Sequence, residues 1–276
     1  MLLAEYSFHP REAVALEALE DEVQGLLASL QKNGQIWGEA VIGHVSGAIQ
    51  VCLQVPARDA LARRHYSEWV RRDLDRVLAL CSREPTWSVV DDRPDLLSGA
   101  TWEADTSLYL FTHLADRTSA VCSGANGKPV PLYLLPLSQQ VREDLVFWAG
   151  DYRTLDELQI RCGQLEIPAY RQLAEVGSEL TNIGRTLSNT VEEATGLHTY
   201  YFLMRYWGRE KGENQGRCPG CGEAWSTPKP RGEKGLARFD FRCEPCRLVS
   251  GETVSLDDEA GAAIGEWPVS GVDAGI

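Results

Sequence analysis

The sequence Cys218-Pro219-Gly220-Cys221 is followed, after 21 intervening residues, by Cys243-Glu244-Pro245-Cys246. Tetrahedral zinc takes four soft ligands, and each Cys-x-x-Cys turn presents two thiolates to one point. The intervening length suits a β-hairpin that lies between two such turns. We therefore predict a zinc ribbon in which one zinc ion is held by Cys218, Cys221, Cys243 and Cys246.

Cysteine fills all four coordination positions of this predicted site. A catalytic zinc ion keeps one position for water or substrate, so a closed set favours a structural ion. Iron in a rubredoxin-like site fits the same spacing, but zinc is favoured because the sequence shows no electron-transfer context. Arg247 follows the second pair where a glycine is expected, and we expect its positive charge to lie beside the thiolates.

The net charge of −13 is unevenly spread along the chain. Residues 205–252 hold ten Lys and Arg against seven Asp and Glu, a net charge of +3 that leaves −16 for the remaining residues. Phosphate binding needs clustered Lys and Arg, so the acidic total argues against a protein that coats nucleic acid nonspecifically. Residues 205–252, which include the four cysteines, are therefore the candidate contact for nucleic acid.

Basic side chains gather at the tip of the predicted hairpin, residues 229–235, and along the strand that follows it. In that strand Phe239 and Phe241 share one face, because side chains alternate. These rings either stack on nucleic-acid bases or form the small core of the ribbon with Trp225, and the core is favoured in so small a module. The candidate nucleic-acid contacts are Lys229, Arg231, Lys234, Arg238 and Arg242.

The two cysteine-bearing segments resemble an uncharacterised proteobacterial family, described as containing a zinc ribbon and proposed to bind nucleic acid. The resemblance is carried by Cys218-Pro219-Gly220-Cys221-Gly222 and by the sequence from Phe239 to Ser250. It implies the same four zinc ligands and an α+β body in front of the ribbon. It also implies a bacterial protein. Nucleic-acid binding is itself an inference within that family, so the resemblance adds little to the charge argument.

Residues 1–90 alternate between strand-like and helix-like patterns. Strands are predicted at 2–8, 36–44, 48–55 and 87–90, and amphipathic helices at 12–31 and 58–81. This β-α-β-β-α-β order is that of a ferredoxin-like unit.

Further strands are predicted at 107–113, 119–123 and 130–135, the last after a turn at Asn126-Gly127. A helical region spans 139–193 with an interruption at 163–168, and the aromatic segment 199–207 leads into the ribbon. We predict an α+β fold with a body at 1–207, a linker at 208–216, a zinc ribbon at 217–256 and a disordered acidic tail at 257–276.

Residues 91–105 are rich in carboxylates: Asp91, Asp92, Asp95, Glu103 and Asp105. Metal-dependent nucleases use such groups, but no lysine stands nearby to complete a nuclease site, so a solvated loop is favoured. No hydrolase, dinucleotide-binding or phosphate-loop motif occurs elsewhere. We predict no catalytic residue, and an enzyme that works at this segment is the weakest hypothesis.

The N-terminus lacks the basic stretch of a secretory signal, and no apolar run is long enough to span a bilayer. We therefore expect a cytoplasmic protein without a membrane partner. The first hypothesis is a non-enzymatic binding protein whose ribbon contacts nucleic acid or a nucleoprotein. The alternative is an immunity (antitoxin-type) protein, in which the acidic body neutralises a basic toxin and the ribbon only stabilises the fold.

Overall fold

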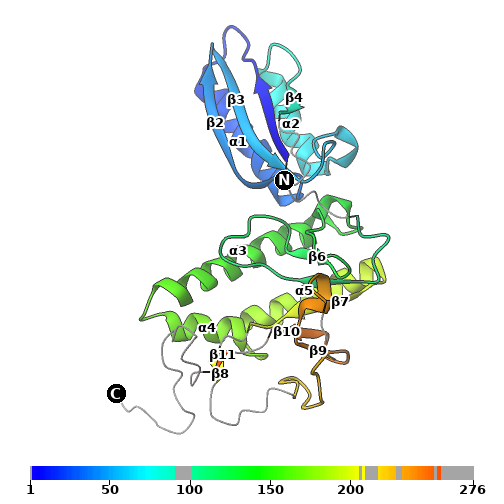
Figure 1. Cartoon of the computed structure of the whole chain (residues 1–276). Helices are drawn as coiled ribbons and strands as arrows, with labels where there is room; N and C mark the ends of the chain where they lie inside the picture. The colour runs from blue at the N-terminus through cyan, green and yellow to red at the C-terminus, as the bar shows by residue number, and fades with distance from the viewer. Residues whose placement is uncertain are drawn as a thin grey trace. The chain divides into compact units, whose positions relative to one another are not determined.

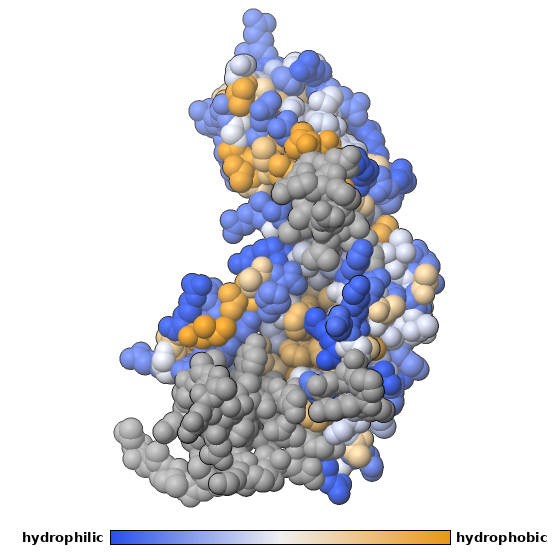
Figure 2. Space-filling model, viewed as in Figure 1, coloured by the Kyte–Doolittle hydropathy of each residue, from blue (hydrophilic) through white to orange (hydrophobic). Residues whose placement is uncertain are grey.

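The structure is a computed structural model of the chain that describes residues 2–90, 101–204, 207–208, 217–227, 232–251 and 254–255. The chain forms two compact units (Figure 1). The first unit comprises Met1–Ala104, Arg117–Cys122 and Lys128–Val146, and the second comprises Asp105–Asp116, Ser123–Gly127 and Phe147–Ile276. Figure 2 shows hydrophobic residues in separate small patches among hydrophilic ones on the visible face of both units.

The first unit is built on a four-stranded antiparallel sheet in the order β2-β3-β1-β4. Its elements, in chain order, are β1 (Leu2–Phe8), α1 (Leu16–Lys32), β2 (Trp37–Val45), β3 (Ala48–Val55), α2 (Glu68–Leu80) and β4 (Thr86–Val89). This order and pairing confirm the predicted ferredoxin-like unit.

The core of the first unit lies between one face of this sheet and the two helices. Along β1 the side chains of Ala4, Tyr6 and Phe8 are buried, as period-two alternation requires. Helix α1 adds a stripe of buried residues at Leu19, Val23, Leu26 and Leu30, which follows its period of 3.6 residues.

Two local details of this unit follow from backbone chemistry. Ser46 and Gly47 join β2 to β3 with φ angles of 51° and 76°, the left-handed values that a tight hairpin turn needs. The prediction that the second helix begins at residue 58 is wrong: α2 begins at Glu68, behind a short 3-10 helix at Arg63–His65. Ser67 ends the preceding segment because its hydroxyl accepts the N–H of Val70 at 3.3 Å and caps α2.

The second unit contains a five-stranded sheet in the order β6-β5-β7-β10-β9. The strands are β5 (Ser107–Leu110), β6 (Val121–Ser123), β7 (His198–Phe202), β9 (Phe241–Cys243) and β10 (Leu248–Ser250). Strand β7 pairs in parallel with β5 and β10, whereas β10 pairs with β9 in antiparallel fashion. Another parallel pair joins β8 (Trp207–Gly208) to β11 (Val254–Ser255).

The predicted helical region consists of α3 (Gln139–Arg161), α4 (Glu166–Ala174) and α5 (Glu179–Thr195). Helix α5 packs on β7, where Gly184 lies against the ring of Tyr201. Among the described residues, no helix has the length and apolar character needed to cross a bilayer.

The strand predicted at 130–135 is absent, and a 3-10 helix at Leu132–Leu134 stands there instead. Pro129 and Pro131 have no N–H groups, so this segment cannot form a regular ladder. The N–H of Val130 donates to the carbonyl of Val121 at 2.7 Å, and Cys122 and Pro129 form an isolated bridge. The turn at Asn126-Gly127 is confirmed, with Gly127 at a φ of 74°.

Strands on both sides of the predicted linker belong to one sheet. Leu248 of β10 pairs with Tyr201 of β7, and Val249 pairs with Phe202. The cysteine-bearing segment is therefore part of the second compact unit and is not separated from residues 198–202. Gly208 lies in β8, while residues 209–216 and the predicted tail at 257–276 lie outside the described residues, so those limits stay predictions.

Candidate metal centre

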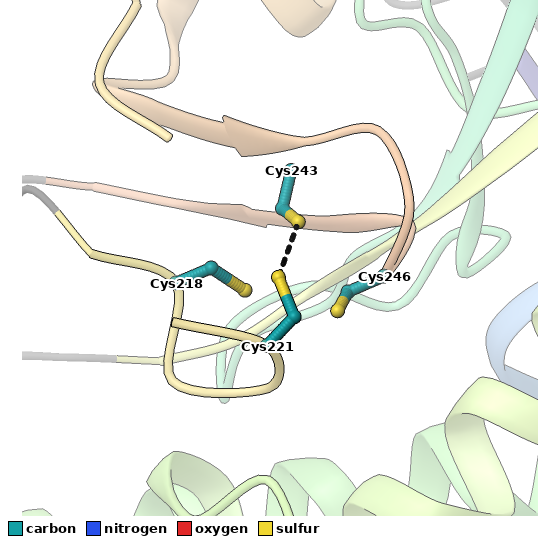
Figure 3. A group of neighbouring side chains, drawn as sticks. All are labelled: Cys218, Cys221, Cys243 and Cys246. Carbon is teal, nitrogen blue, oxygen red and sulfur yellow. Dashed lines mark hydrogen bonds between the residues drawn. The ribbon is translucent and has the colours of Figure 1, made fainter. Parts of the chain in front are cut away.

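The four cysteines predicted as zinc ligands meet at one point in the second unit (Figure 3). Their Sγ atoms all lie within 4.8 Å of one another, and the Sγ atoms of Cys221 and Cys243 are 3.6 Å apart. A tetrahedral zinc ion with 2.3 Å bonds to sulfur separates its ligands by about 3.8 Å. The cluster is therefore compact enough to hold one metal ion.

The first cysteine pair lies in a turn that is closed by backbone hydrogen bonds. The N–H of Gly222 donates to the carbonyl of Cys218 at 2.8 Å, and Gly222 has a φ of 77°. The N–H of Gly220 donates to Cys218 Sγ at 3.4 Å. These two bonds fix the backbone of the turn that carries Cys218 and Cys221.

The second cysteine pair lies at the turn between two paired strands. Cys243 is the last residue of β9 and is paired with Leu248 of β10. Arg247, just before β10, has a φ of 52°, which is the left-handed value that Gly222 takes after the first pair. A residue with a Cβ atom meets a cost of about 1 kcal/mol or more in this conformation.

The side chain of Arg247 takes part in a network of polar groups beside the cluster. Its guanidinium lies 3.2 Å from Glu192 Oε2 and 2.8 Å from His198 Nδ1, and it donates to the carbonyl of Glu244 at 2.6 Å. The charge expected to lie beside the thiolates is thus engaged with the carboxylate of Glu192. The network connects the second cysteine turn to the end of helix α5.

The space around the sulfurs is tightly limited. A Cβ atom added at Gly220 would lie 3.0 Å from Cys246 Sγ, which is closer than ordinary van der Waals contact. A side chain at position 220 would therefore require Cys246 Sγ to shift by a few tenths of an ångström.

The thiols of this cluster have opposed tendencies to ionise. Burial raises the pKa of Cys246 to about 11 and holds the pKa of Cys243 higher still. The N–H of Glu223 lowers the pKa of Cys221, which is solvent-exposed. Four adjacent thiolates repel one another, so a bound cation is what allows all of them to ionise.

The predicted nucleic-acid contacts differ in their surroundings. Lys234, Arg238 and Arg242 are exposed, and Arg242 forms an ion pair with Glu244 at 2.9 Å. The guanidinium of Arg238 lies over aromatic rings, 4.5 Å from the centre of Phe111. Lys229 and Arg231 lie outside the described residues, as do Asp91, Asp92 and Asp95 of the acidic segment.

The aromatic residues of the predicted hairpin form a core, which confirms the favoured interpretation. Trp225, Phe239 and Phe241 are all buried, and Trp225 stacks on Phe241 with ring centres 5.1 Å apart. These rings are therefore not available to stack on bases.

The sequence reasoning missed two half-buried rings in the same unit. Phe111 and Phe202 meet with ring centres 5.0 Å apart, and Phe202 also contacts Phe239. The two rings and Arg238 come from segments that are far apart in the sequence. No local pattern therefore indicated that they lie together. Phe202 did belong to the aromatic segment at 199–207, which was its only signal.

Two acidic residues of the predicted carboxylate-rich segment, Asp105 and Glu103, lie in the described part of the chain. Asp105 accepts a hydrogen bond from Ser123 Oγ at 2.8 Å, and Glu103 is exposed. Within the described part of the chain, the four cysteines are the only group of three or more metal-binding side chains that converge.

Three family models, each described as a domain of unknown function, match successive parts of this chain. They cover residues 1–91 (DUF8589), 103–204 (DUF2310) and 208–257 (DUF8594). An uncharacterised protein of Haemophilus influenzae is 33% identical over 143 residues, which are 51% of this chain and 68% of that protein. Another uncharacterised protein of the same organism is 29% identical over 251 residues, or 85% and 94% of the two chains.

Solved structures are similar to a smaller part of the chain. A crystal structure of an antibiotic biosynthesis monooxygenase is 16% identical, with 34% of this chain and all of the other covered, at a TM-score of 0.26. A Mycobacterium tuberculosis protein is 15% identical, with 34% and 96% covered, at the same TM-score. Similarity at this level supports no functional argument.

Proposed function

This chain belongs to the same family as the uncharacterised Haemophilus influenzae protein to which it is 33% identical, and from that premise we propose a non-enzymatic binding protein that holds one structural zinc ion and contacts nucleic acid beside it. The proposal has two parts, the metal and the partner, and each has its own test.

The choice of zinc rests on the chemistry of the donor set. Four thiolates in a closed tetrahedral arrangement are typical of structural zinc, which needs no open position and no redox change. The spacing of the sulfurs, with Cys221 and Cys243 3.6 Å apart, suits that geometry. Iron bound to four cysteines has similar geometry, so the metal has to be measured.

Elemental analysis of protein purified without added metal tests this part. We expect one zinc ion per chain and little iron. Cys221→Ser should lose the metal, whereas Cys52→Ser, which changes another exposed cysteine outside the cluster, should keep it. Iron as the main metal would contradict the zinc assignment, and retention of a full zinc ion by Cys221→Ser would contradict the ligand set.

The nucleic-acid part is supported by one observation above all. Arg238 is exposed, and its guanidinium lies 4.5 Å from the centre of the half-buried Phe111 ring, which in turn meets Phe202. Surfaces that bind single strands combine cations for phosphates with rings or guanidinium planes for bases. Arg238 thus offers both a charge and a planar stacking surface.

The charge distribution supports the same surface. Residues 205–252 carry a net charge of +3 on a chain that is otherwise strongly acidic. If Lys234, Arg238 and Arg242 each meet one phosphate, the affinity for a single strand should fall with salt with a logarithmic slope of about −2.

Fluorescence anisotropy with labelled single-stranded RNA and DNA, over a range of NaCl concentrations, tests this part. Arg238→Gln should weaken binding and reduce the salt slope by about 0.7. Arg161→Gln removes the same charge from an exposed position on α3 and should leave both quantities unchanged. An absence of salt-dependent binding to either nucleic acid would overturn the proposal.

A second variant separates charge from stacking. Arg238→Lys keeps the charge but loses the planar guanidinium. We expect it to keep the salt slope and still bind more weakly than the natural protein. Equal affinity would mean that only charge is recognised and that the contact with Phe111 has no part in binding.

A further inference from the structure

The sheet of the first unit has one covered face and one open face. The core of this unit lies between the sheet and helices α1 and α2, and on that side Ala4, Tyr6 and Phe8 of β1 are buried. Because side chains alternate along a strand, the residues between them, Glu5 and Ser7, lie on the opposite face. Strands β2, β3 and β4 are paired in register with this arrangement, so each contributes residues to the same open face.

Exposed hydrophobic side chains gather on this open face. Val41 pairs with Cys52 and Cys52 pairs with Glu5, so these three residues form one row across β2, β3 and β1. Val41 is 67% exposed, and Cys52 is exposed as well. By the same alternation, the face also carries three further exposed hydrophobic residues: Leu3, Val45 and Val90. Half of the large hydrophobic residues that are exposed in the described part of the chain therefore lie on one sheet face.

The open face carries very little charge, although the whole chain has a net charge of −13. Among the described residues of β1 to β4, and outside the irregular pairing between Trp37 and Val41, Glu5 is the only charged residue that points outward. Nucleic acid and strongly basic proteins both bind through opposite charges, which suits this face poorly. The same face of a second copy is equally apolar and equally uncharged, so it is the partner that matches best.

The size of the face sets the affinity that a contact between two copies can reach. The sheet has four strands about 4.8 Å apart, and β1 extends for seven residues of about 3.3 Å each. The face therefore measures at most about 19 Å by 23 Å, and two such faces together about 900 Å². This area lies near the lower limit for a specific interface, so the contact should be weak and should dissociate on dilution.

We propose that the open face of the β1–β4 sheet packs against the same face of a second copy of the chain. The exposed hydrophobic side chains of each copy, Val41 among them, are thereby removed from water. Strand β3 lies inside the sheet, so a two-fold axis through the centre of the face brings the two Cys52 side chains close together. The contact is independent of the metal centre and of nucleic-acid binding.

Sedimentation velocity of the full-length, metal-loaded protein at about 1–500 µM tests the proposal. We expect monomers at the lowest concentrations and dimers at the highest, with a dissociation constant of about 1–100 µM. Val41→Glu places a charge in the contact and should raise this constant about tenfold or more. Ile183→Glu makes the same change at an exposed hydrophobic residue of α5, outside the face, and should leave the constant unchanged. A monomer at every concentration, or an unweakened dimer in Val41→Glu, would overturn the proposal.

The charge of Glu5 distinguishes a second copy from a basic partner. In a symmetric dimer each copy brings its own Glu5 to the contact, so Glu5→Gln should lower the dissociation constant by removing repulsion between like charges. A higher constant in this variant would show that Glu5 meets a cation, which contradicts the packing of two identical faces.

Cross-linking through Cys52 locates the contact on the molecule. A short bismaleimide reagent should link two copies of the metal-loaded protein, because Cys52 is exposed and lies on the open face. Cys52→Ser should lose the cross-link and keep the dimer, and Val41→Glu should lose the cross-link together with the dimer. A cross-link of equal yield in Cys52→Ser would place the contact elsewhere and overturn the proposal.

Discussion

Arg247 Nε lies 3.2 Å from Glu192 Oε2, so the residue that follows the last cysteine is tied to helix α5. The same arginine has a φ of 52°, in the region that glycine prefers. Its side chain and its backbone therefore have opposite effects on stability: the side chain stabilises the turn through Glu192, and the backbone is strained.

Substitutions at Arg247 should separate these two effects. Arg247→Ala loses the ion pair and keeps the strain, whereas Arg247→Gly loses the ion pair and relieves the strain. We expect urea unfolding to show the glycine variant more stable than the alanine variant by about 1 kcal/mol. Gly222→Ala, at a φ of 77° with no atom near the added Cβ, should lose a similar amount. Equal stability of the two Arg247 variants would rule out backbone strain.

The carboxylate of Glu192 should make stability depend on pH. Burial opposes its ionisation, but hydrogen bonds from the Thr199 N–H, Arg247 and His198 outweigh burial and lower the pKa of Glu192. A lowered pKa stabilises the fold above the usual glutamate pKa, and this stabilisation is lost as pH falls through the lowered value.

Glu192→Gln should therefore flatten the decline of the unfolding free energy between about pH 5 and pH 3. Urea unfolding at several pH values measures this decline. Glu157→Gln, which changes an exposed glutamate on α3, is the matched control and should keep the natural profile. An unchanged profile in Glu192→Gln would show that this carboxylate does not contribute.

Loss of the metal should disturb the second unit beyond the cysteine turns. Strand β10 lies between β9 and β7, and its residues Leu248 and Val249 are fully buried. We expect Cys243→Ser to raise hydrogen exchange in β9, β10 and the neighbouring β7, because a structural zinc site supplies about 10 kcal/mol of folding free energy. Exchange in β1 to β4 of the first unit should stay slow.

The control for the Cys243→Ser experiment is Cys52→Ser, because Cys52 is exposed whereas Cys122 is buried. It should leave exchange unchanged in both units. If the increase in Cys243→Ser stopped at residues 217–251 and left β7 protected, the cysteine segment would behave as a separate domain despite the shared sheet.

Local patterns were sufficient to predict much of this fold. The alternation of Ala4, Tyr6 and Phe8 and the helical stripe of α1 each lie within one element, so the elements of the first unit could be read from neighbouring residues. The four cysteine ligands were equally local, because each pair is contained in one turn.

Features that depend on distant residues could not be predicted in this way. The pairing of Leu248 with Tyr201 joins segments on both sides of the expected linker, and sequence spacing carries no signal for it. The contact between the Arg238 guanidinium and the Phe111 ring also joins segments that are far apart in the sequence, so it could not be predicted either. The start of α2 was misplaced for a local reason, since the cap at Ser67 competed with helix-forming residues before it.

Metal affinity should rise steeply with pH. In the metal-free protein, burial raises the pKa of Cys246 to about 11 and that of Cys243 further, so both are thiols at neutral pH. Zinc binds thiolates, and binding must release at least these two protons. We expect the apparent affinity to increase about a hundredfold per pH unit near neutrality, as measured by competition with a chelator. An affinity independent of pH would contradict thiolate ligation.

Gly184 of α5 is required by the packing of this helix on β7. A Cβ atom there would overlap the ring of Tyr201 and lie 2.7 Å from Trp148 Nε1. Both rings are buried, and Trp148 Nε1 donates to the carbonyl of Leu180 at 3.2 Å, so neither can move without loss. Gly184→Ala should therefore lower the unfolding free energy of the second unit by about 1–3 kcal/mol.

Gly150 of α3 provides the opposite case within the same unit, because no atom lies within 4 Å of an added Cβ. Gly150→Ala should raise the unfolding free energy by about 0.5–1 kcal/mol, the difference in helix propensity. Chemical denaturation of both variants, followed by a probe in the second unit, makes the comparison. If both substitutions had the same sign, close packing of α5 on β7 would not be the reason for glycine at position 184.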